Sequence, residues 1–322
     1  MAEITYGSAN TFNSASSSPL FVAVLDATHF VAVYQDAGNS NQGTAIVGVI
    51  SGTTISSYGT ESTFNAAGVD NTNIAVLDST HFVVAFRDGG DSDKGKAILG
   101  SVSGTTITHG SESQFTASNS IVNSVAALDS THFVIVFRDI GNSSHGTAIV
   151  GVTSGTTISS YGSTNVFNAA STTVMSVAAL DSTHFVVVFK DGGDSDNGKG
   201  VIGVISGTTI SSYGSESTFN AVNTNEIAVT ALDATHFVVA YQDTGGDSYG
   251  AARVGTTDGS TTIDSFDTEN IFNSAVTTKN SVAIFSEYLF VVAYNNAATT
   301  GDAIVGSIPE VAATDTGFFL MF

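Results

Sequence analysis

The sequence contains no cysteine and no tryptophan, and it is poor in basic residues. The absence of cysteine excludes disulfides, cysteine-based zinc sites and thiol catalysis. Only 8 Lys plus Arg stand against 29 Asp plus Glu in 322 residues, so the net charge is −21. A charge of this sign and size repels phosphate backbones, and we therefore expect no nucleic acid partner.

Long apolar runs and an export signal are also missing. The sequence contains no stretch of about 18 apolar residues, the length needed to span a membrane. The N-terminal residues lack the basic start and apolar block of a signal peptide. Because only 11% of the residues are charged, the chain is too hydrophobic to be disordered and can bury a large core. We expect a folded, soluble domain.

The most prominent feature that is present is a repeat. The segment LD-x-THF begins at Leu25, Leu77, Leu128, Leu180 and Leu232, with spacings of 52, 51, 52 and 52 residues. A diverged sixth copy begins at Phe285 as FSEYLFVVAYNN. A fixed period of this size is typical of a repeat architecture.

One period contains four predicted strands, separated by turn-forming residues. In the second copy they are NIAVLD (73–78), HFVVAFRD (81–88), GKAILGSVSG (95–104) and TTITHGSESQF (105–115). The second strand is apolar on both faces, which requires that both faces of its sheet be covered. The fourth is rich in Ser, Thr and Glu and suits an edge strand that faces water. This pattern resembles the four-stranded blades of a β-propeller.

The two ends of the chain complement each other. The start, MAEITYGSANTFNSA, matches the fourth-strand segment, since Tyr6, Gly7 and Phe12 fall where later copies have Tyr213, Gly214 and Phe219. The sixth copy has three strands and lacks a fourth. We therefore predict an all-β fold over residues 1–308, a six-bladed β-propeller of four-stranded antiparallel blades. Its ring is predicted to be closed by the N-terminal strand, which completes the last blade.

The Asp-x-Thr-His segment is the first candidate for chemistry. In the second copy it reads Asp78, Ser79, Thr80 and His81, the residue types of a catalytic triad. A triad needs side chains that converge from separate elements, whereas these share one tight turn, and Ala replaces the Ser in two copies. We interpret the segment as turn chemistry, with Asp accepting backbone N–H bonds, and predict no catalytic residues and no enzyme activity.

The repeated histidines form a second candidate, because equivalent positions in a propeller make a ring near one face. Such rings can bind metals or sense pH. Neighbouring blades would hold the imidazoles too far apart to share a metal, and the sixth copy has Leu289 at this position. We expect these side chains to pack at the base of the second strand. They are His29, His81, His132, His184 and His236.

The loops after the second strand are a third candidate, because two of them are rich in aspartate. Calcium prefers several oxygen ligands from a short loop that contains Gly. The sister loops replace the acids by Asn, and Asn, Asp, Ser and Gly also suit a hairpin loop, so both interpretations stay open. We predict no cofactor, and calcium is the one ion that these loops could bind. The candidate ligands are Asp88, Asp91 and Asp93 in one loop and Asp191, Asp194 and Asp196 in the other.

A repeated glycan site is a fourth candidate. Sugar platforms usually need Trp or stacked Tyr with polar neighbours, and this chain has no Trp. Tyr58, Tyr161 and Tyr213 each precede a Gly in the fourth-strand segment, where packing at the edge of the blade also explains them.

The last fourteen residues, 309–322, lie outside the repeat and end in five apolar side chains. Full burial of one such side chain is worth roughly 1.5 to 3 kcal/mol, so we expect the tail to dock. The protein's own surface and a neighbouring subunit are the two alternatives, and the second would produce rings or filaments. The predicted assembly residues are Phe318, Phe319, Leu320, Met321 and Phe322.

Together these patterns predict a non-enzymatic structural or adhesive module that self-associates through its tail. We expect it outside the cell or on the surface of a particle, with a glycan or another surface ligand as a partner. The alternative is a multivalent propeller with a glycan or calcium site on each blade.

Overall fold

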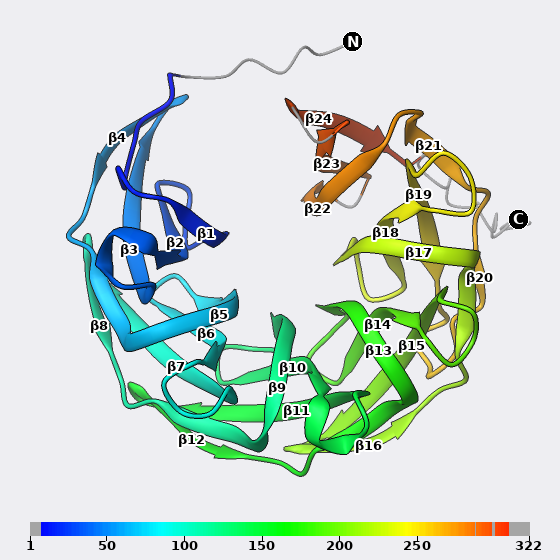
Figure 1. The fold of residues 1–322 in the computed structure, drawn as a ribbon, viewed down its shortest axis with the longest axis horizontal. Helices are drawn as coiled ribbons and strands as arrows, with labels where there is room; N and C mark the ends of the chain where they lie inside the picture. Colours follow the sequence, from blue (N-terminus) through cyan, green and yellow to red (C-terminus); the bar gives the residue numbers. More distant parts are fainter. Residues whose placement is uncertain (1–7, 287, 298–299, 309–322) are drawn as a thin grey trace, which may run out of the picture.

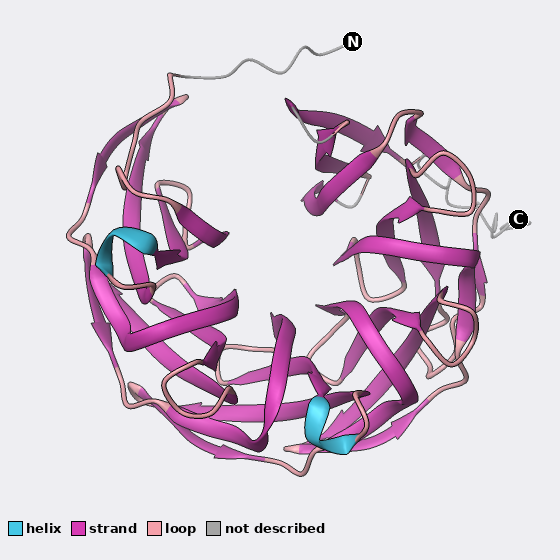
Figure 2. Ribbon diagram, in the orientation of Figure 1, coloured by secondary structure: helices cyan, strands magenta, loops and turns pink. Residues whose placement is uncertain are grey.

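The computed structural model describes residues 8–286, 288–297 and 300–308. Almost all regular structure in them is β-strand, with two short 3-10 helices, η1 (Ala37–Asn39) and η2 (Ile140–Asn142). None of the helices in these ranges is long or apolar enough to cross a membrane. The strands form consecutive antiparallel units that curve around a central opening (Figures 1 and 2). The predicted all-β fold is confirmed.

The strands recur in the same order along the chain. The first unit contains β1 (Ser17–Val24), β2 (His29–Asp36), β3 (Gln42–Ser51) and β4 (Thr54–Tyr58). The second contains the end of β5 (Ser62–Asp78), then β6 (His81–Asp88), β7 (Lys94–Ser103) and β8 (Thr106–His109). The third contains the end of β9 (Ser113–Ala127), then β10 (His132–Asp139), β11 (His145–Ser154) and β12 (Thr157–Tyr161).

The remaining units follow the same plan. The fourth contains the end of β13 (Asn165–Ala179), then β14 (His184–Asp191), β15 (Asn197–Ser206) and β16 (Thr209–Tyr213). The fifth contains the end of β17 (Ser217–Ala231), then β18 (His236–Asp243), β19 (Tyr249–Thr256), β20 (Ser265–Phe266) and β21 (Asn270–Asn273). The sixth contains β22 (Thr277–Ser286), β23 (Leu289–Asn296) and β24 (Thr300–Ser307).

Four long strands connect neighbouring units, which the sequence pattern did not predict. The start of β5 pairs with β3 at the outer edge of the first unit, and its end pairs with β6 as the innermost strand of the second. The strands β9, β13 and β17 repeat this arrangement. In the first four units each predicted fourth strand is therefore built from two pieces, a short outer strand and the start of the next long one, while in the fifth unit the second piece is the separate strand β21.

The hydrophobic core lies between the units rather than inside any one of them. Along β6 the side chains of residues 82–86 are fully buried, and alternate ones point to opposite faces of the sheet. Phe82, Val84 and Phe86 pack against the first unit, while Val83 and Ala85 pack against the third. The expectation that the second strand is covered on both faces is confirmed.

The ring is open between the first and sixth units, which stand apart across a gap (Figure 1). Val22 on β1 is 56% exposed, whereas Ile74 at the equivalent position of β5 is 8% exposed. On β24, Ile304 is 39% exposed, whereas the equivalent Ile46 is 2% exposed. Both end units therefore present apolar side chains that their counterparts bury.

The predicted closure by an N-terminal strand is not present among the described residues. Residues 8–16 form no strand, and β24 pairs only with β23 in the described part of the sixth unit. The segment instead docks on the first unit: the Phe12 ring lies 5.1 Å from Tyr34, much as Phe64 lies 5.2 Å from Phe86. Residues 1–7 and the predicted tail 309–322, with its assembly residues, lie outside the described residues.

Candidate functional site on the Asp-Thr-His face

Each Asp-x-Thr-His segment forms a tight turn between the first and second strands of its unit. In the first unit, Asp26 Oδ1 accepts from the backbone N–H of Thr28 at 2.7 Å and from that of His29 at 2.9 Å. The Thr28 hydroxyl donates to the same oxygen at 2.8 Å. The His29 Nδ1 lies 3.0 Å from Asp26 Oδ2. The aspartate therefore organises the turn, as the sequence predicted.

The same Asp–His contact recurs in the next four units. The Nδ1 to Oδ2 distances are between 2.9 and 3.0 Å in the pairs Asp78–His81, Asp129–His132, Asp181–His184 and Asp233–His236. The hydrogen bonds from Thr28 and His29 hold the pKa of Asp26 at about 2. Burial raises the pKa of Asp129, but the bonds from Thr131 and His132 outweigh it and hold that pKa at about 2 as well. These aspartates are therefore anionic at neutral pH.

The geometry of the turn does not provide a catalytic relay. In such a relay Asp binds one imidazole nitrogen and the nucleophile binds the other. Here the Thr28 hydroxyl and Asp26 both contact Nδ1 of His29, at 3.0 Å each. Because the Asp fixes the proton on Nδ1, the neutral imidazole presents an acceptor lone pair at Nε2. No hydrogen bond among the described residues uses Nε2 in any of the five turns.

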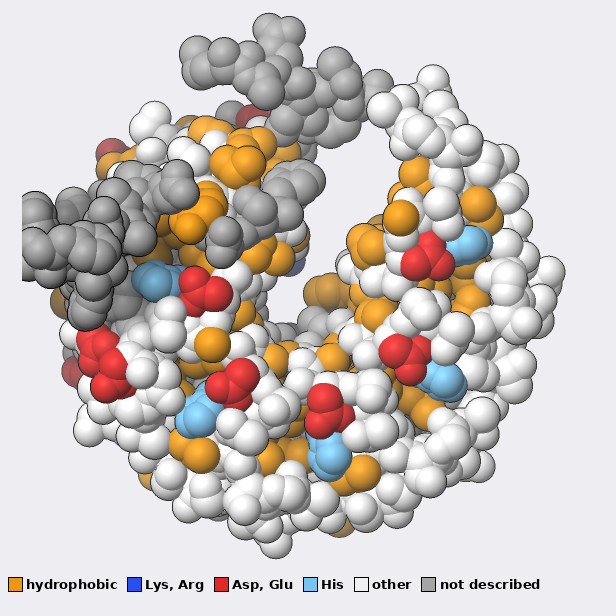
Figure 3. Space-filling model, turned by 180° about the vertical axis from the view of Figure 1, so that it is seen from behind, with side chains coloured by type: hydrophobic (Ala, Val, Ile, Leu, Met, Phe, Trp, Pro, Cys, Tyr) orange, Lys and Arg blue, Asp and Glu red, His pale blue; other side chains and the backbone are white. Residues whose placement is uncertain are grey.

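The five turns surround the central opening on one face of the molecule, where each His lies beside its Asp (Figure 3). The imidazoles are between 22 and 38% exposed, so ligands in solution can reach them. A shallow pocket of about 170 Å³ lies at the junction of the first and second units. It is lined by Leu25, Asp26, His29, Ser79, Thr80, Val102 and Gly104. The repeat places a His, a Ser and a Thr at the same positions of the next two junctions, whereas Ala234 replaces the Ser at the fourth–fifth junction.

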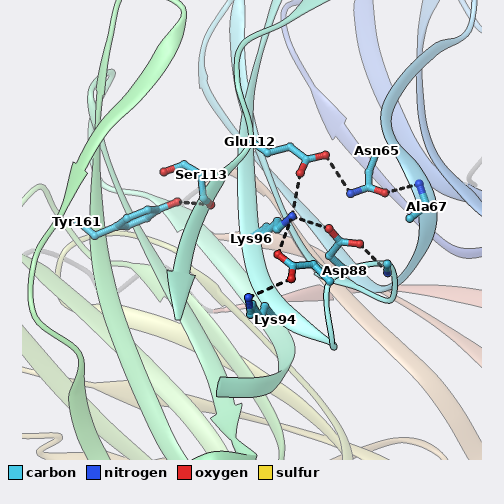
Figure 4. A network of polar contacts seen from close by, with 10 residues as sticks. Asn65, Ala67, Asp88, Lys94, Lys96, Glu112, Ser113 and Tyr161 are labelled. Carbon is cyan, nitrogen blue, oxygen red and sulfur yellow. Dashed lines mark hydrogen bonds and ion pairs between the residues drawn. The ribbon is translucent and has the colours of Figure 1, made fainter. Parts of the chain in front are cut away.

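The opposite ends of the same second strands carry carboxylate clusters. Lys96 on β7 contacts Asp88 at 2.7 Å, Asp91 at 3.3 Å and Glu112 at 3.1 Å (Figure 4). Asp88 is 5% exposed, and these contacts, through their hydrogen bonds and charges, raise the pKa of Lys96 despite its burial. The fourth unit repeats the cluster, with Lys199 at 2.8 Å from Asp191, 3.0 Å from Asp194 and 3.0 Å from Glu216.

The structure thus places the predicted calcium residues in ion pairs. Asp93 pairs with Arg87, and Asp196 lies 3.4 Å from Lys190. In the described part of the chain, no group of three or more His, Asp or Glu side chains has the arrangement of a metal site. Calcium at these two loops stays a prediction, and a calcium ion there would have to displace a lysine ammonium.

The bridging residues of these clusters were not identified from the sequence. Lys96 lies within a β-strand, and Glu112 is 24 residues beyond Asp88, so neither spacing marks a site. A usable signal exists: Lys96 and Lys199 occupy the same repeat position, as do Glu112 and Glu216. The lysine and the glutamate thus occur together in the second copy and again in the fourth.

No family model and no curated protein sequence matches the chain. Solved structures match its shape. The BP39L lectin from Burkholderia pseudomallei superposes with a TM-score of 0.63 at 10% identity, over 89% of this chain and 81% of the lectin. The subtype N10 neuraminidase-like protein of A/little yellow-shouldered bat/Guatemala gives 0.58 at 8% identity, over 92% and 94%.

The Hadza microbial sialidase Hz136 gives a TM-score of 0.56 at 11% identity over 90% of this chain. This chain spans 65% of the length of that sialidase. Identities this low indicate a shared fold and carry no activity with them. The fold is therefore of the β-propeller type.

Proposed function

We propose that this protein is a non-enzymatic β-propeller that binds carbohydrate at repeated sites on its Asp-Thr-His face. The observation that carries the proposal is the junction pocket, which combines the partly exposed His29 with Ser and Thr hydroxyls; the sequence repeats these three residue types at the next two junctions. Similarity in shape to a lectin supports it. We place this role outside the cell or on a particle surface, where an adhesive module meets glycans.

The chemistry of the pocket suits sugar hydroxyls, which both donate and accept hydrogen bonds. His29 Nε2 accepts, and the hydroxyl of Ser79 can donate or accept. The pocket is shallow and contains no aromatic side chain on which a sugar ring could stack, so one site binds weakly. Several sites on one rigid face compensate through multivalency.

A glycan array tests the function, and titration calorimetry with a hit tests the site. We expect binding to surface-displayed glycans that falls stepwise in His29→Ala, the His29→Ala/His81→Ala double variant and the triple variant with His132→Ala. His145→Ala is the matched control, since His145 begins β11 at the opposite end of the unit and its loss leaves binding unchanged. Unaltered binding by the triple variant would show that glycans bind elsewhere on the protein. The absence of binding to any glycan on the array would contradict the proposed function.

We also propose that six blades close into a ring with the N-terminal strand as the missing fourth strand of the last blade. In every other unit an aromatic ring of the outer strand lies between two phenylalanines, as Tyr58 does between Phe12 and Phe30. The others are His109, Tyr161, Tyr213 and Phe266. In the sixth unit the two phenylalanines, Phe272 and Phe290, line a cavity of about 460 Å³.

Tyr6 is the residue that the repeat supplies for this cavity. The pairing of Gly48 with Tyr58 corresponds to Gly306 with Tyr6, and Gly306 lies beneath the Phe290 ring as Gly48 lies beneath Phe30. Because the chain has no tryptophan, Tyr6→Trp makes a single fluorescent reporter. We expect the emission of this tryptophan to be blue-shifted, and we expect Phe290→Ala in the same variant to shift it to longer wavelength. Emission typical of exposed indole in Tyr6→Trp alone would rule out closure by this strand.

Self-association is the second candidate, and the exposed apolar faces of the two end units favour it. Val22, Val24 and Val305 are 56%, 65% and 44% exposed, and a second copy could cover them. The contact would join different faces of two copies, so it would propagate into rings or filaments. Analytical ultracentrifugation of the full chain tests for self-association, and a variant without residues 317–322 tests whether the predicted tail takes part. An equal, monomeric sedimentation coefficient for both would end the idea.

A further inference from the structure

A pair of carboxylates in the first unit lacks the bridging group that equivalent pairs have in other units. Asp36 and Glu61 occupy the positions of Asp88 and Glu112. Two carboxylates that share a site repel each other unless a proton or a cation lies between them. The other units show what that group can be.

In the second and fourth units the bridge is a lysine ammonium. Lys96 Nζ contacts Asp88 Oδ2 and Glu112 Oε2, and Lys199 Nζ contacts Asp191 Oδ2 and Glu216 Oε2. In the fifth unit the bridge is a tyrosine hydroxyl, since Tyr249 contacts Asp243 Oδ2 at 3.2 Å and Glu269 Oε1 at 2.9 Å.

In the third unit Thr164 replaces the glutamate, so no pair exists there. Every other complete pair in the described units thus has a donor or cation between its oxygens.

The first unit has Thr44 at the lysine position, because Thr44 pairs with Tyr34 on the neighbouring strand as Lys96 pairs with Phe86. Residues that pair directly across strands point to the same face, so the Thr44 hydroxyl points where the Lys96 side chain points. Thr44 is 2% exposed, and its Oγ1 is buried without a hydrogen-bond partner among the described residues. Threonine is shorter than lysine, and no hydrogen bond joins the Thr44 hydroxyl to either carboxylate.

The carboxylate oxygens that a lysine would contact are also available. Asp36 Oδ1 accepts from Asn13 Nδ2 at 3.0 Å and from the Gly38 N–H at 2.9 Å, which leaves Oδ2. Glu61 Oε1 accepts from the Tyr34 hydroxyl at 2.8 Å, which leaves Oε2. Within the described residues no hydrogen bond or ion pair uses either remaining oxygen. Asp36 is 6% exposed, whereas Glu61 lies at the surface, so the space opens to solvent on one side.

We propose that the first unit binds a hard metal cation, with calcium as the best match, at the place that Lys96 fills in the second unit. The ligands are Asp36 Oδ2, Glu61 Oε2 and Thr44 Oγ1, with water at the remaining positions. Carboxylate, hydroxyl and water oxygens are the donors that calcium prefers, and calcium tolerates an irregular set of them better than magnesium does. The metal ion takes the place that the lysine ammonium has in the second unit, but unlike the ammonium it can dissociate.

Thermal unfolding with calcium or a chelator tests the site, and Thr44→Lys is the decisive variant. The wild type should melt about 4 °C higher with calcium at a hundred times its dissociation constant than in chelator. Magnesium and sodium at matched ionic strength should do less. Thr44→Lys should remove this dependence and melt as the calcium-loaded wild type does, because lysine supplies the bridge. Thr147→Lys in the third unit is the matched control: Thr164 replaces the glutamate there, so this lysine completes no carboxylate pair and should leave the calcium dependence of melting unchanged.

A direct binding measurement keeps the proposal testable if Thr44→Lys fails to fold. Terbium occupies calcium sites and is sensitised by a nearby tyrosine, and Tyr34 donates to one of the ligands. We expect saturable luminescence in the wild type and a loss of at least tenfold in affinity in Glu61→Gln. Identical melting in calcium and chelator would identify the bridge as water and overturn the proposal. Calcium dependence that survives both Thr44→Lys and Glu61→Gln would place the ion elsewhere and also overturn it.

Discussion

His109 is the one histidine at a position where three other units have tyrosine, and replacing it should change how stability depends on pH. Its ring lies between Phe64 and Phe82, with centroids at 6.0 and 6.2 Å. Both ring nitrogens are buried without a hydrogen-bond partner. Burial lowers the pKa of His109, and the nearby Ser62 backbone, which does not reach hydrogen-bond geometry with the ring, offsets this in part.

The magnitude follows from the buried nitrogens and from the sister units. Leaving a buried polar group without a partner costs about 1–3 kcal/mol. In the third unit the Tyr161 hydroxyl donates to the Ser113 carbonyl at 3.3 Å, a long bond worth about 0.5 kcal/mol. His109→Tyr should therefore raise the free energy of unfolding by about 1–2 kcal/mol at pH 7.

The sign of the pH effect follows from the direction of the pKa shift. The folded protein prefers neutral His109, so the full stability is present above the unfolded pKa of about 6.5. It is lost as the pH falls below that value towards the lowered folded pKa, by at most about 1.4 kcal/mol per pH unit. The advantage of His109→Tyr should therefore grow between pH 7 and pH 5.

Denaturant titrations of three proteins at pH 8 and pH 5 measure this effect. His109→Tyr should lose less stability on acidification than the wild type, and Tyr161→His should lose more, because it places the same imidazole in the third unit. The five Asp–His turns are the same in all three proteins, so their contribution to stability cancels in the differences. Equal losses on acidification in all three would refute the reasoning.

Two further predictions concern packing and charge. Lys96→Met should lower the free energy of unfolding by about 2–3 kcal/mol at pH 7, because it leaves the buried Asp88 carboxylate without its cationic partner. This value allows for the partial exposure of Glu112, whose ion pair with Lys96 is also lost. The deficit should shrink in acid, because the low pKa of Asp91, held down by Lys94 and Lys96, gives stability that disappears as that carboxylate is protonated. Gly100→Ala should cost about 3 kcal/mol, since a Cβ there would lie 2.2 Å from the buried Phe82 ring. Gly104→Ala, at φ +62° in open space, should cost about 1 kcal/mol, and equal midpoints in urea for the two glycine variants would contradict the steric argument.

The repeat, the strand positions and the turn chemistry could be read from the sequence because each depends on neighbours along the chain. The segment predicted as a strand over 81–88 is β6, and the Asp in the turn before it accepts the bonds that the Asp-x-Thr spacing implied. The fused strands could not be read in this way. Residues 65–73 of β5 are mostly small or polar, and Asn71 takes a positive φ of 49° at a register shift, which breaks the alternation.

The residue pattern along the chain specifies a set of similar β-sheet units whose central strands need cover on both faces. Three features appear only in the folded chain: the end units stand apart, Lys96 and Lys199 pair with the aspartates of the neighbouring loops, and the carboxylates of the first unit have no lysine between them. The physical reason is distance along the chain. Whether Lys96 meets Asp88 and Glu112 depends on which faces and registers three strands share, and no local pattern encodes that. Where the first unit carries Thr44 in place of Lys96, only the folded unit shows that the Thr44 hydroxyl is buried without a hydrogen-bond partner.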